Sequence, residues 1–348
     1  MRVATFLAAL TLLTQSANTR PSFAQFLIGV RAEALAKGIR PEIVDEALGT
    51  IDEPLPVVIE RDRTQAEMVL ALEKYVDRRL TPKFVKAARE MFTRHRTLLD
   101  KVAGRYGVSP RIIVAVWGLE SNYGRFSGRY PTIAAFATLA WDPRRSSFFR
   151  GELFNALEIL NRGDIDLAHM RGSWAGAMGQ LQFMPSSYLK FAEDFNGDGR
   201  RDIWSTKADV FASIANYLKG HGWAEGEAWG VEVQVSADAA KKIAAEVARR
   251  TGSCQATRDM TVFQPVNAWR AIGVRLRNGA ALPGTLANAA MVSGATRHFL
   301  VYGNYDALLE YNCAHSYAIS VGLLADRIGG GSPAASHKAP KRRAPRRR

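Results

Sequence analysis

The sequence contains little cysteine and no long apolar run beyond its N-terminus. Only Cys254 and Cys313 occur among the 348 residues, so at most one intramolecular disulfide can form. No cysteine lies near residue 24, which argues against a lipid-modified N-terminus. After residue 24 no segment has the roughly 20 consecutive apolar residues that a membrane-spanning helix requires. With 47% hydrophobic and 23% charged residues, the chain has the composition of a globular protein.

The first residues have the pattern of a secretory signal. Met1 and Arg2 precede the apolar run 3–14, and Ser22-Phe23-Ala24 fits the small-x-small rule for cleavage. We therefore expect residues 1–24 to be a signal peptide that is cleaved near Ala24 and directs the chain to the periplasm. An uncleaved anchor helix is the alternative, although the run is short for a bilayer.

Export would also decide the state of the two cysteines. In an oxidising compartment Cys254 and Cys313 are expected to form a disulfide that ties an inserted lobe to a C-terminal helix. Two unrelated buried thiols are the alternative.

The positive charge is concentrated at the C-terminus. Seven of the charges behind the formal net charge of +14 lie in residues 332–348, which contain neither an acid nor a large apolar residue. Such a segment cannot bury a core, so 329–348 is expected to be a disordered basic tail behind a glycine hinge. We expect it to contact anionic envelope polymers or lipid head groups. Nucleic acid is the rival partner, but the export signal and the absence of a recognition module argue against it.

The remaining sequence predicts a mainly α-helical protein with one β-containing insertion. Apolar periodicity and proline-initiated helices predict an N-terminal helical lobe over 25–105 and a helical core over 106–225. A small α/β lobe is expected over 226–304, with strands at VEVQV, RDMTVF, GVRLRNG and RHFLVYG and a helix near 238–250. Residues 305–328 return to helix and to the core. The core positions expected there are Leu308, Leu309, Ala318, Val321 and Leu324.

One acidic residue lies at the end of the most hydrophobic predicted helix. Ser109 and Pro110 mark a helix start, and the apolar body IIVAVWGL leads to Glu120, just before the C-cap residues Asn122 and Gly124. Apolar neighbours and the negative end of the helix dipole both disfavour an ionised carboxylate, so we expect a raised pKa. A carboxyl that stays protonated near neutral pH can act as a general acid. An ordinary carboxylate that caps the helix and pairs with an arginine is the alternative.

Six segments rich in glycine, aromatic and polar residues lie in order between residues 25 and 328. They are WGLESNYGRFSG, DPRRSSFFRGEL, RGSWAGAMGQLQFMPSSY, DFNGDGRRDIW, ANYLKGHGW and YNCAHSYAISVGLLADR. Together they resemble the lytic murein transglycosylases of the membrane-bound B type. The resemblance implies a goose-lysozyme-like helical core, a preceding helical lobe and a small inserted β lobe.

The resemblance also implies the reaction. Members of this family cleave the MurNAc–GlcNAc β-1,4 bond of peptidoglycan glycan strands without water, leave 1,6-anhydromuramic acid and use no catalytic cofactor. The sequence departs from the membrane-bound name because it has no lipobox. We therefore expect a monomer that is free in the periplasm or held there by its basic tail.

Roles for individual residues follow from the same resemblance. It implies that Glu120 is the single acid and base, and that Ser173 approaches the N-acetyl group of the reacting sugar. The other residues implied to bind substrate are Gln182, Arg144, Arg145, Tyr217, Tyr311, Asn312, Tyr317 and Tyr75. Arg144 and Arg145 would meet carboxylates of the peptide stems, with a solvated surface pair as the alternative. Tyrosine suits a sugar-binding wall because an apolar ring carries a polar tip. Phe148 stands where some relatives have tyrosine, which removes one possible hydrogen bond.

A calcium-type loop follows the central motif. The candidate ligands are Asp194, Asn196, Asp198, the carbonyl of Arg200 and Asp209. The first four fit positions 1, 3, 5 and 7 of an EF-hand loop, but position 12 is Ser205 rather than glutamate. The related family closes a longer loop with an aspartate, which gives Asp209 its place. We expect a structural Ca²⁺, with an acidic turn that binds no metal as the alternative.

Two other functions remain open at this stage. A hydrolytic lysozyme needs two carboxylates, yet no acid follows Glu120 before Asp142 and none lies in GSWAGAMGQLQF. A non-catalytic peptidoglycan-binding protein would keep the fold and lose the chemistry. The retained set Glu120, Ser173, Gln182 and Asn312 argues against that second alternative.

Overall fold

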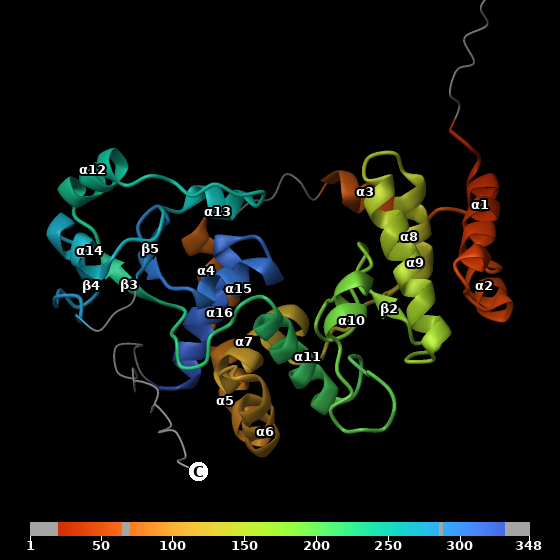
Figure 1. Cartoon of the computed structure of the whole chain (residues 1–348), viewed down its shortest axis with the longest axis horizontal. Helices are drawn as coiled ribbons and strands as arrows, with labels where there is room; N and C mark the ends of the chain where they lie inside the picture. The colour runs from red at the N-terminus through yellow and green to blue at the C-terminus, as the bar shows by residue number, and fades with distance from the viewer. Residues whose placement is uncertain (1–19, 65–69, 285–287, 331–348) are drawn as a thin grey trace, which may run out of the picture.

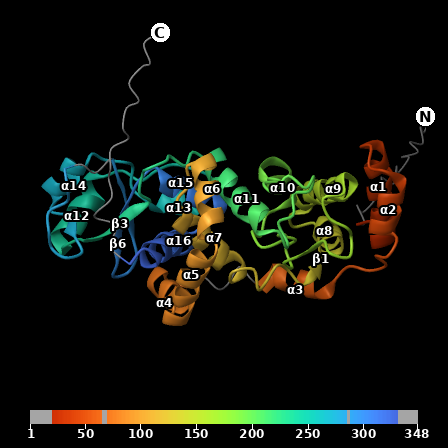
Figure 2. The ribbon, with the colours of Figure 1, turned by 90° about the horizontal axis from the view of Figure 1, so that it is seen from below.

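The computed structural model describes residues 20–64, 70–284 and 288–330. It is mostly helical, as predicted, and elongated, with α1 and α2 at one end and a small sheet at the other (Figures 1 and 2). The helices are α1 Phe23–Ala36, α2 Pro41–Leu48, α3 Pro56–Thr64, α4 Leu72–Arg79, α5 Pro82–Arg94, α6 Arg96–Tyr106, α7 Pro110–Ser121, α8 Thr132–Trp141, α9 Ser146–Arg162, α10 Pro185–Phe191, α11 Lys207–Gly220, α12 Ala237–Glu246, α13 Gln255–Asp259, α14 Val266–Ile272, α15 Asn304–Tyr311 and α16 His315–Ile328. The strands are β1 Tyr130–Pro131, β2 Arg171–Gly172, β3 Gly230–Gln234, β4 Arg275–Leu276, β5 Ala290–Ser293 and β6 His298–Val301. Most of the expected signal peptide and nearly all of the basic tail lie outside the described residues.

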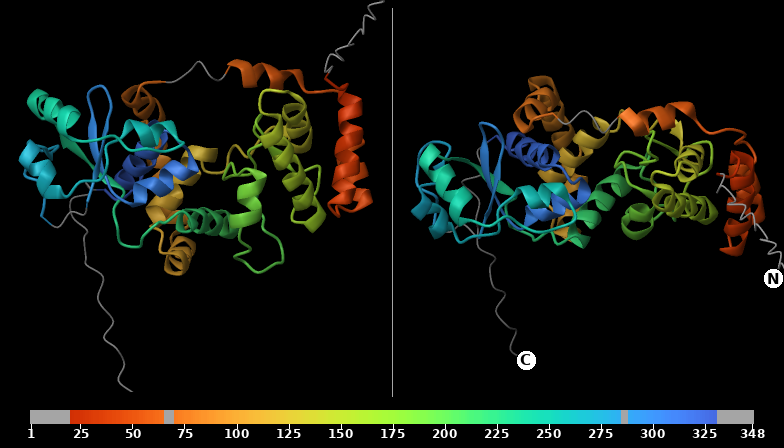
Figure 3. Two further views of the ribbon diagram at one scale, coloured as in Figure 1. Left: turned by 45° about the horizontal axis from the view of Figure 1, so that its top comes forward. Right: turned by 90° about the horizontal axis from the view of Figure 1, so that it is seen from above.

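The predicted N-terminal lobe over 25–105 is not a single packed unit. Helices α1, α2 and α3 pack against α8 and α9, whereas α4, α5 and α6 pack against α7, α11 and α16. Figure 3 shows the two groups on opposite sides of the molecule's middle. Each group therefore buries apolar residues against a different part of the core.

The start of α1 includes the position near Ala24 where cleavage is expected. The Ser22 hydroxyl accepts a hydrogen bond from the backbone N–H of Gln25 at 3.2 Å, and the Gln25 side chain accepts one from the Ser22 N–H at 3.1 Å. Phe23 is buried, with its ring centroid 5.5 Å from that of Trp141. A chain that began after Ala24 would lack both the capping box and this ring.

Helix α7 lies at the centre of the helical core. It packs against α5, α6, α11 and α16, and its residues from Ile112 to Leu119 are all buried. Pro110 occupies the first turn, and Asn122 ends the helix in the left-handed conformation at φ 51°. This helix was predicted with the correct start and end.

The small lobe has a core of its own. Its four-stranded antiparallel sheet has the order β4-β3-β6-β5 and packs with α12 and α14 around Trp269. The predicted strands at VEVQV and RHFLVYG are present as β3 and β6, and the predicted helix is α12. The prediction of a strand at RDMTVF is wrong, because its first two residues end α13 and Thr261 makes only an isolated bridge to Arg249.

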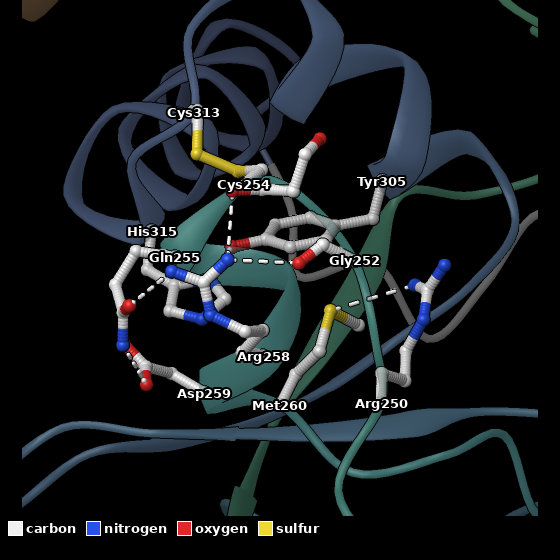
Figure 4. Close-up of a disulfide and its surroundings, with 11 residues drawn as sticks. Arg250, Gly252, Cys254, Gln255, Arg258, Asp259, Met260, Tyr305, Cys313 and His315 are labelled. Atoms are coloured by element: carbon white, nitrogen blue, oxygen red, sulfur yellow. Dashed lines mark hydrogen bonds between the residues drawn. A yellow bond between two sulfur atoms is a disulfide. The ribbon is translucent and has the colours of Figure 1, made fainter.

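The last two helices return to the helical core and carry the link to the small lobe. The five residues predicted to be core in this segment are all buried. The chain leaves the helical conformation between α15 and α16, and there Cys313 forms a disulfide with Cys254, with their Cα atoms 6.0 Å apart (Figure 4). Arg258 orders the other side of the bridge by donating to the carbonyls of Gly252 and Ser253 at 2.8 and 2.7 Å.

Within the described ranges no helix combines the length and the apolar character that crossing a bilayer requires.

Candidate active site

Glu120 lies in the last turn of α7 and is surrounded by protein on most sides. Its side chain keeps some exposure to solvent, while burial raises its pKa from 4.5 to about 7. The cost of desolvating an ionised carboxylate is the main cause. This carboxyl can therefore carry a proton at neutral pH, which is the property predicted for it.

Two neighbours oppose the effect of burial on Glu120. The charge of Arg79 on α4 lowers the pKa, and so does the hydroxyl of Tyr317 on α16, which points to the carboxyl without reaching regular hydrogen-bond geometry. Arg79 is held in place because its guanidinium donates to the carbonyl of Leu119. Among the described residues no other carboxylate contributes to the pKa of Glu120. The side chains that shift its pKa are thus a cation and a phenol.

A group of tyrosines forms a wall beside this acid. The ring centroids of Tyr311 and Tyr317 lie 6.2 Å apart, and the charge of Glu120 raises the pKa of both phenols beyond the effect of their burial. The ring of Tyr217 packs against that of Tyr311 at an angle of 58° with centroids 4.8 Å apart, and Tyr75 on α4 lies close enough to Tyr317 to raise its pKa further. Tyr311 and Tyr317 are thus neighbours of Glu120, and Tyr217 and Tyr75 are connected to it through them.

Backbone carbonyls fix the two central tyrosines. The Tyr311 hydroxyl donates to the carbonyl of Leu181 at 3.0 Å, and the Tyr217 hydroxyl donates to the carbonyl of Glu310 at 2.8 Å. The ring of Phe183 packs 5.2 Å from Tyr217. The tyrosine wall is therefore continuous with the segment 172–183.

That segment holds Ser173 and Gln182 in a tight turn. Ser173 accepts a hydrogen bond from the N–H of Ala177 at 3.1 Å, and Gln182 donates to the carbonyl of Gly179 at 2.9 Å from a backbone at φ 53°. Gly176 is required, because a Cβ there would lie 2.2 Å from the ring of Phe136. Gln182 precedes Phe183, whose ring packs against Tyr217 and Tyr311, and within the described residues no hydrogen bond joins Ser173 or Gln182 to Glu120.

Asn312 occupies the break between α15 and α16. Its side chain is exposed and makes no hydrogen bond with the described residues, and it stands between Tyr311 and the disulfide-bonded Cys313. It is therefore available to a ligand that lies against the tyrosine wall.

Arg144 and Arg145 belong to a different group. Both pair with the buried carboxylate of Asp62 on α3, and Arg144 also donates to the Asp62 carbonyl at 2.7 Å. Their side chains are 47% and 46% exposed, so each retains donors for another partner. The pair is neither a purely solvated surface pair nor part of the Glu120 group. The sequence could not show Asp62, which lies more than 80 residues earlier.

Arg79 is the functional candidate that sequence reasoning missed. It lies 40 residues before Leu119, to whose carbonyl it donates. The only local signal was a helix with arginines in its last turn, and that pattern is common on solvated helices.

The calcium-type loop places some of its expected ligands together. Asp194 accepts hydrogen bonds from the N–H groups of Gly197 and Gly199 at 2.7 and 2.8 Å, which closes the loop around its first carboxylate. Asp209 is buried, and burial raises its pKa, as does the charge of Asp194. These hard oxygen donors have the chemistry that Ca²⁺ prefers. However, among the described residues no three acidic, histidine or cysteine side chains converge closely enough to form a metal site.

Comparisons with known proteins place this arrangement in context. Residues 22–326 match the family described as Transglycosylase SLT domain. Over 155 residues, 44% of this chain, the sequence is 39% identical to membrane-bound lytic murein transglycosylase B of Escherichia coli K12. That match spans 43% of the length of the E. coli protein.

Solved structures match over most of the chain. SltB3 of Pseudomonas aeruginosa in complex with NAG-anhNAM-pentapeptide aligns with a TM-score of 0.80 and 39% identity, over 89% of this chain and 80% of SltB3. The E. coli lytic transglycosylase Slt35 in complex with calcium aligns with a TM-score of 0.72 and 27% identity, over 89% of this chain and 93% of Slt35.

Proposed function

Since the chain belongs to the transglycosylase SLT domain family, we propose that it is a lytic transglycosylase of peptidoglycan. It cleaves the MurNAc–GlcNAc β-1,4 bond and leaves a 1,6-anhydroMurNAc end. The observation that carries this proposal is the single carboxyl of Glu120, whose pKa of about 7 lets it hold a proton at neutral pH. A hydrolase of this kind would need a second carboxylate to activate water or to act as nucleophile.

Glu120 acts first as an acid. The protonated carboxyl gives its proton to the glycosidic oxygen as the C1–O bond of MurNAc breaks, and GlcNAc departs with that oxygen as a hydroxyl. The positive charge that develops at C1 is stabilised by the sugar's own N-acetyl group, which Ser173 and Asn312 orient. Arg79 and the Tyr317 hydroxyl stabilise the carboxylate that has just formed, because both favour the ionised state of Glu120.

Glu120 then acts as a base. Its carboxylate takes the proton from the C6 hydroxyl of the same MurNAc while the C6 oxygen bonds to C1. The anhydro ring closes and Glu120 is again protonated, so no water is consumed. One residue can serve both steps because its pKa near 7 makes both proton transfers accessible.

The remaining predicted residues bind the glycan strand. Tyr75, Tyr217, Tyr311 and Gln182 form the wall against which the sugar rings lie. The rings of Tyr217 and Tyr311 are fixed there because their hydroxyls donate to backbone carbonyls. Arg144 and Arg145 carry a net charge of one after pairing with Asp62, and they meet a carboxylate of the substrate farther from the scissile bond.

The domain organisation has one inserted lobe, residues 226–304. Residues 25–105 do not form a second lobe, because their helices pack in two groups.

The test is the product. Purified protein acting on isolated sacculi should release muropeptides with 1,6-anhydro ends, which mass spectrometry reads as one water lighter than hydrolysed ends. Mainly reducing ends would identify a lysozyme, and no soluble product would identify a binding protein.

We propose that calcium binds at the loop formed by Asp194, Asn196, Asp198 and the Arg200 carbonyl, with Asp209 closing it. Support comes from the Slt35 relative, which was solved with calcium, and from the charge of Asp194, which lies close enough to Asp209 to raise its pKa. The ion would be structural. Melting temperature should rise with calcium concentration in the wild type and not in Asp194→Asn. An equal rise in both proteins would show that calcium binds at another site.

We also propose a location and partners for the protein. The chain acts in the periplasm as a monomer after removal of a signal peptide, with its basic tail against anionic envelope polymers or lipid head groups. Ser22 and Phe23 are part of α1, so N-terminal sequencing of the exported protein should find a start at or before Ser22. A start at Gln25 would contradict the role of this cap.

A further inference from the structure

A cavity of about 420 Å³ opens between α5 and the loop that follows α7. Its lining includes Lys83, Phe84, Lys86, Glu90, Asn122 and Arg125, and we call it the basic pocket. The volume lies in the range of ligand-binding pockets, about 300–1,000 Å³.

The basic pocket has uncompensated positive charge. Lys86 lies 4.0 Å from Glu90, one turn along α5, in an exposed pair of little energetic value. Within residues 20–64, 70–284 and 288–330, neither Lys83 nor Arg125 has an acidic partner within 4.0 Å. Three cations face one acid, so the pocket complements an anion.

The basic pocket shares its elements with the site around Glu120. Asn122 ends α7 two residues after Glu120. The ring of Phe84 lies 5.0 Å from the ring of Tyr123, and the guanidinium of Arg79, which also acts on Glu120, lies 6.0 Å from the Phe84 ring. The basic pocket therefore lies next to the segment that carries Glu120.

Only one part of the substrate carries the matching charge. The sugars of a glycan strand are neutral once the lactyl carboxyl of MurNAc is amide-linked to its peptide stem, so the carboxylates of the strand are those of the stems. Arg144 and Arg145, which meet a substrate carboxylate farther from the scissile bond, are held by Asp62 outside the Glu120 group. On the basis of the proposed function, we propose that the basic pocket binds a carboxylate of a peptide stem next to the cleavage site.

Binding of a soluble stem tests this independently of catalysis. The probe is the tetrapeptide L-Ala-γ-D-Glu-diaminopimelate-D-Ala, measured by calorimetry against the wild type and the double variant Lys83→Gln, Arg125→Gln. The variant should bind at least about tenfold more weakly, because it loses a charge-assisted hydrogen bond. A tetrapeptide whose side-chain carboxyls are amidated should bind the wild type as weakly as the unmodified tetrapeptide binds the variant.

Matched charge removal provides the control. The double variant Lys241→Gln, Lys242→Gln removes two exposed charges from α12 in the small lobe and should bind the tetrapeptide like the wild type. Equal binding by the wild type and the pocket variant, or no binding by the wild type, would overturn the proposal. Equal melting temperatures verify that the variants fold.

Kinetics separate this proposal from the proposed function. On glycan strands that carry stems, the pocket variant should show a KM raised about tenfold with kcat little changed; on strands stripped of peptide by an amidase the rise should be several-fold smaller. Equal rises on both substrates would mean that the pocket binds sugar. If the wild type forms no anhydro product from either substrate, the proposed function fails, whereas tetrapeptide binding still decides what the pocket recognises.

Discussion

Replacement of Glu120 by glutamine should remove activity and raise stability at the same time. At an ordinary pKa of 4.5 only about 1 in 300 of these carboxyls would be protonated at pH 7, whereas at a pKa of about 7 roughly half are. Burial therefore supplies the acid form on which the first step depends. Glutamine keeps the shape and cannot transfer the proton, so turnover should fall by a factor on the order of 10² or more.

The stability effect follows from the same pKa. The folded state binds the Glu120 proton more tightly than the unfolded chain, so stability is lost as pH rises through the interval from 4.5 to about 7. The full interval corresponds to about 3 kcal/mol, an upper bound because the side chain keeps some exposure. Glutamine does not titrate, so Glu120→Gln should melt several degrees above the wild type at pH 8 and close to it at pH 4.

The assay combines release of anhydro-muropeptides, read by mass spectrometry, with thermal unfolding at both pH values. Glu246→Gln on α12 is the matched control, because this glutamate is exposed and should change neither readout. The wild-type kcat should be level below pH 6 and fall about tenfold per pH unit well above pH 7. The reasoning is refuted if Glu120→Gln retains more than a tenth of the activity, or if its stability relative to the wild type does not depend on pH.

Two further predictions concern the surroundings of this acid. Arg79→Met removes a charge that lowers the pKa of the catalytic carboxyl, so the alkaline limb of the pH–rate profile should move to higher pH, while the exposed Arg78→Met should leave the limb in place. Replacing both Cys254 and Cys313 by serine opens a bridge with a sequence separation of 59 residues and should lower the free energy of unfolding by up to about 4 kcal/mol. In the same variant kcat should fall, because Tyr311 and Tyr317 flank the bridge; an unchanged kcat would show that α15 and α16 position these rings without it.

The catalytic helix could be predicted because all of its signals are local. The start at Ser109-Pro110, the apolar body and the Asn122 cap lie within one short segment, and the structure places α7 where the sequence put it. The raised pKa of Glu120 was expected from that segment as well, and its main cause in the structure is burial of the carboxyl.

Contacts between distant segments could not be predicted in this way. Arg79 contacts Leu119, 40 residues later, and Asp62 contacts Arg144, 82 residues later. No sequence feature near either residue of a pair indicates its partner. The division of α1–α6 between two parts of the core has the same origin. The apolar residues of one helix do not indicate which apolar surface will cover them.

The order in which the chain supplies the site has a consequence for when activity begins. Glu120 is complete with α7, yet Tyr311 and Tyr317 arrive only with α15 and α16, the last helices of the described chain. A polypeptide that crosses a membrane N-terminus first therefore presents the glutamate long before the surroundings that give it a neutral-range proton. Until the final helices dock, this carboxyl is an ordinary acid and is ionised at neutral pH. Under the proposed export, Glu120 therefore acquires its raised pKa only once the last described helices have folded onto α7.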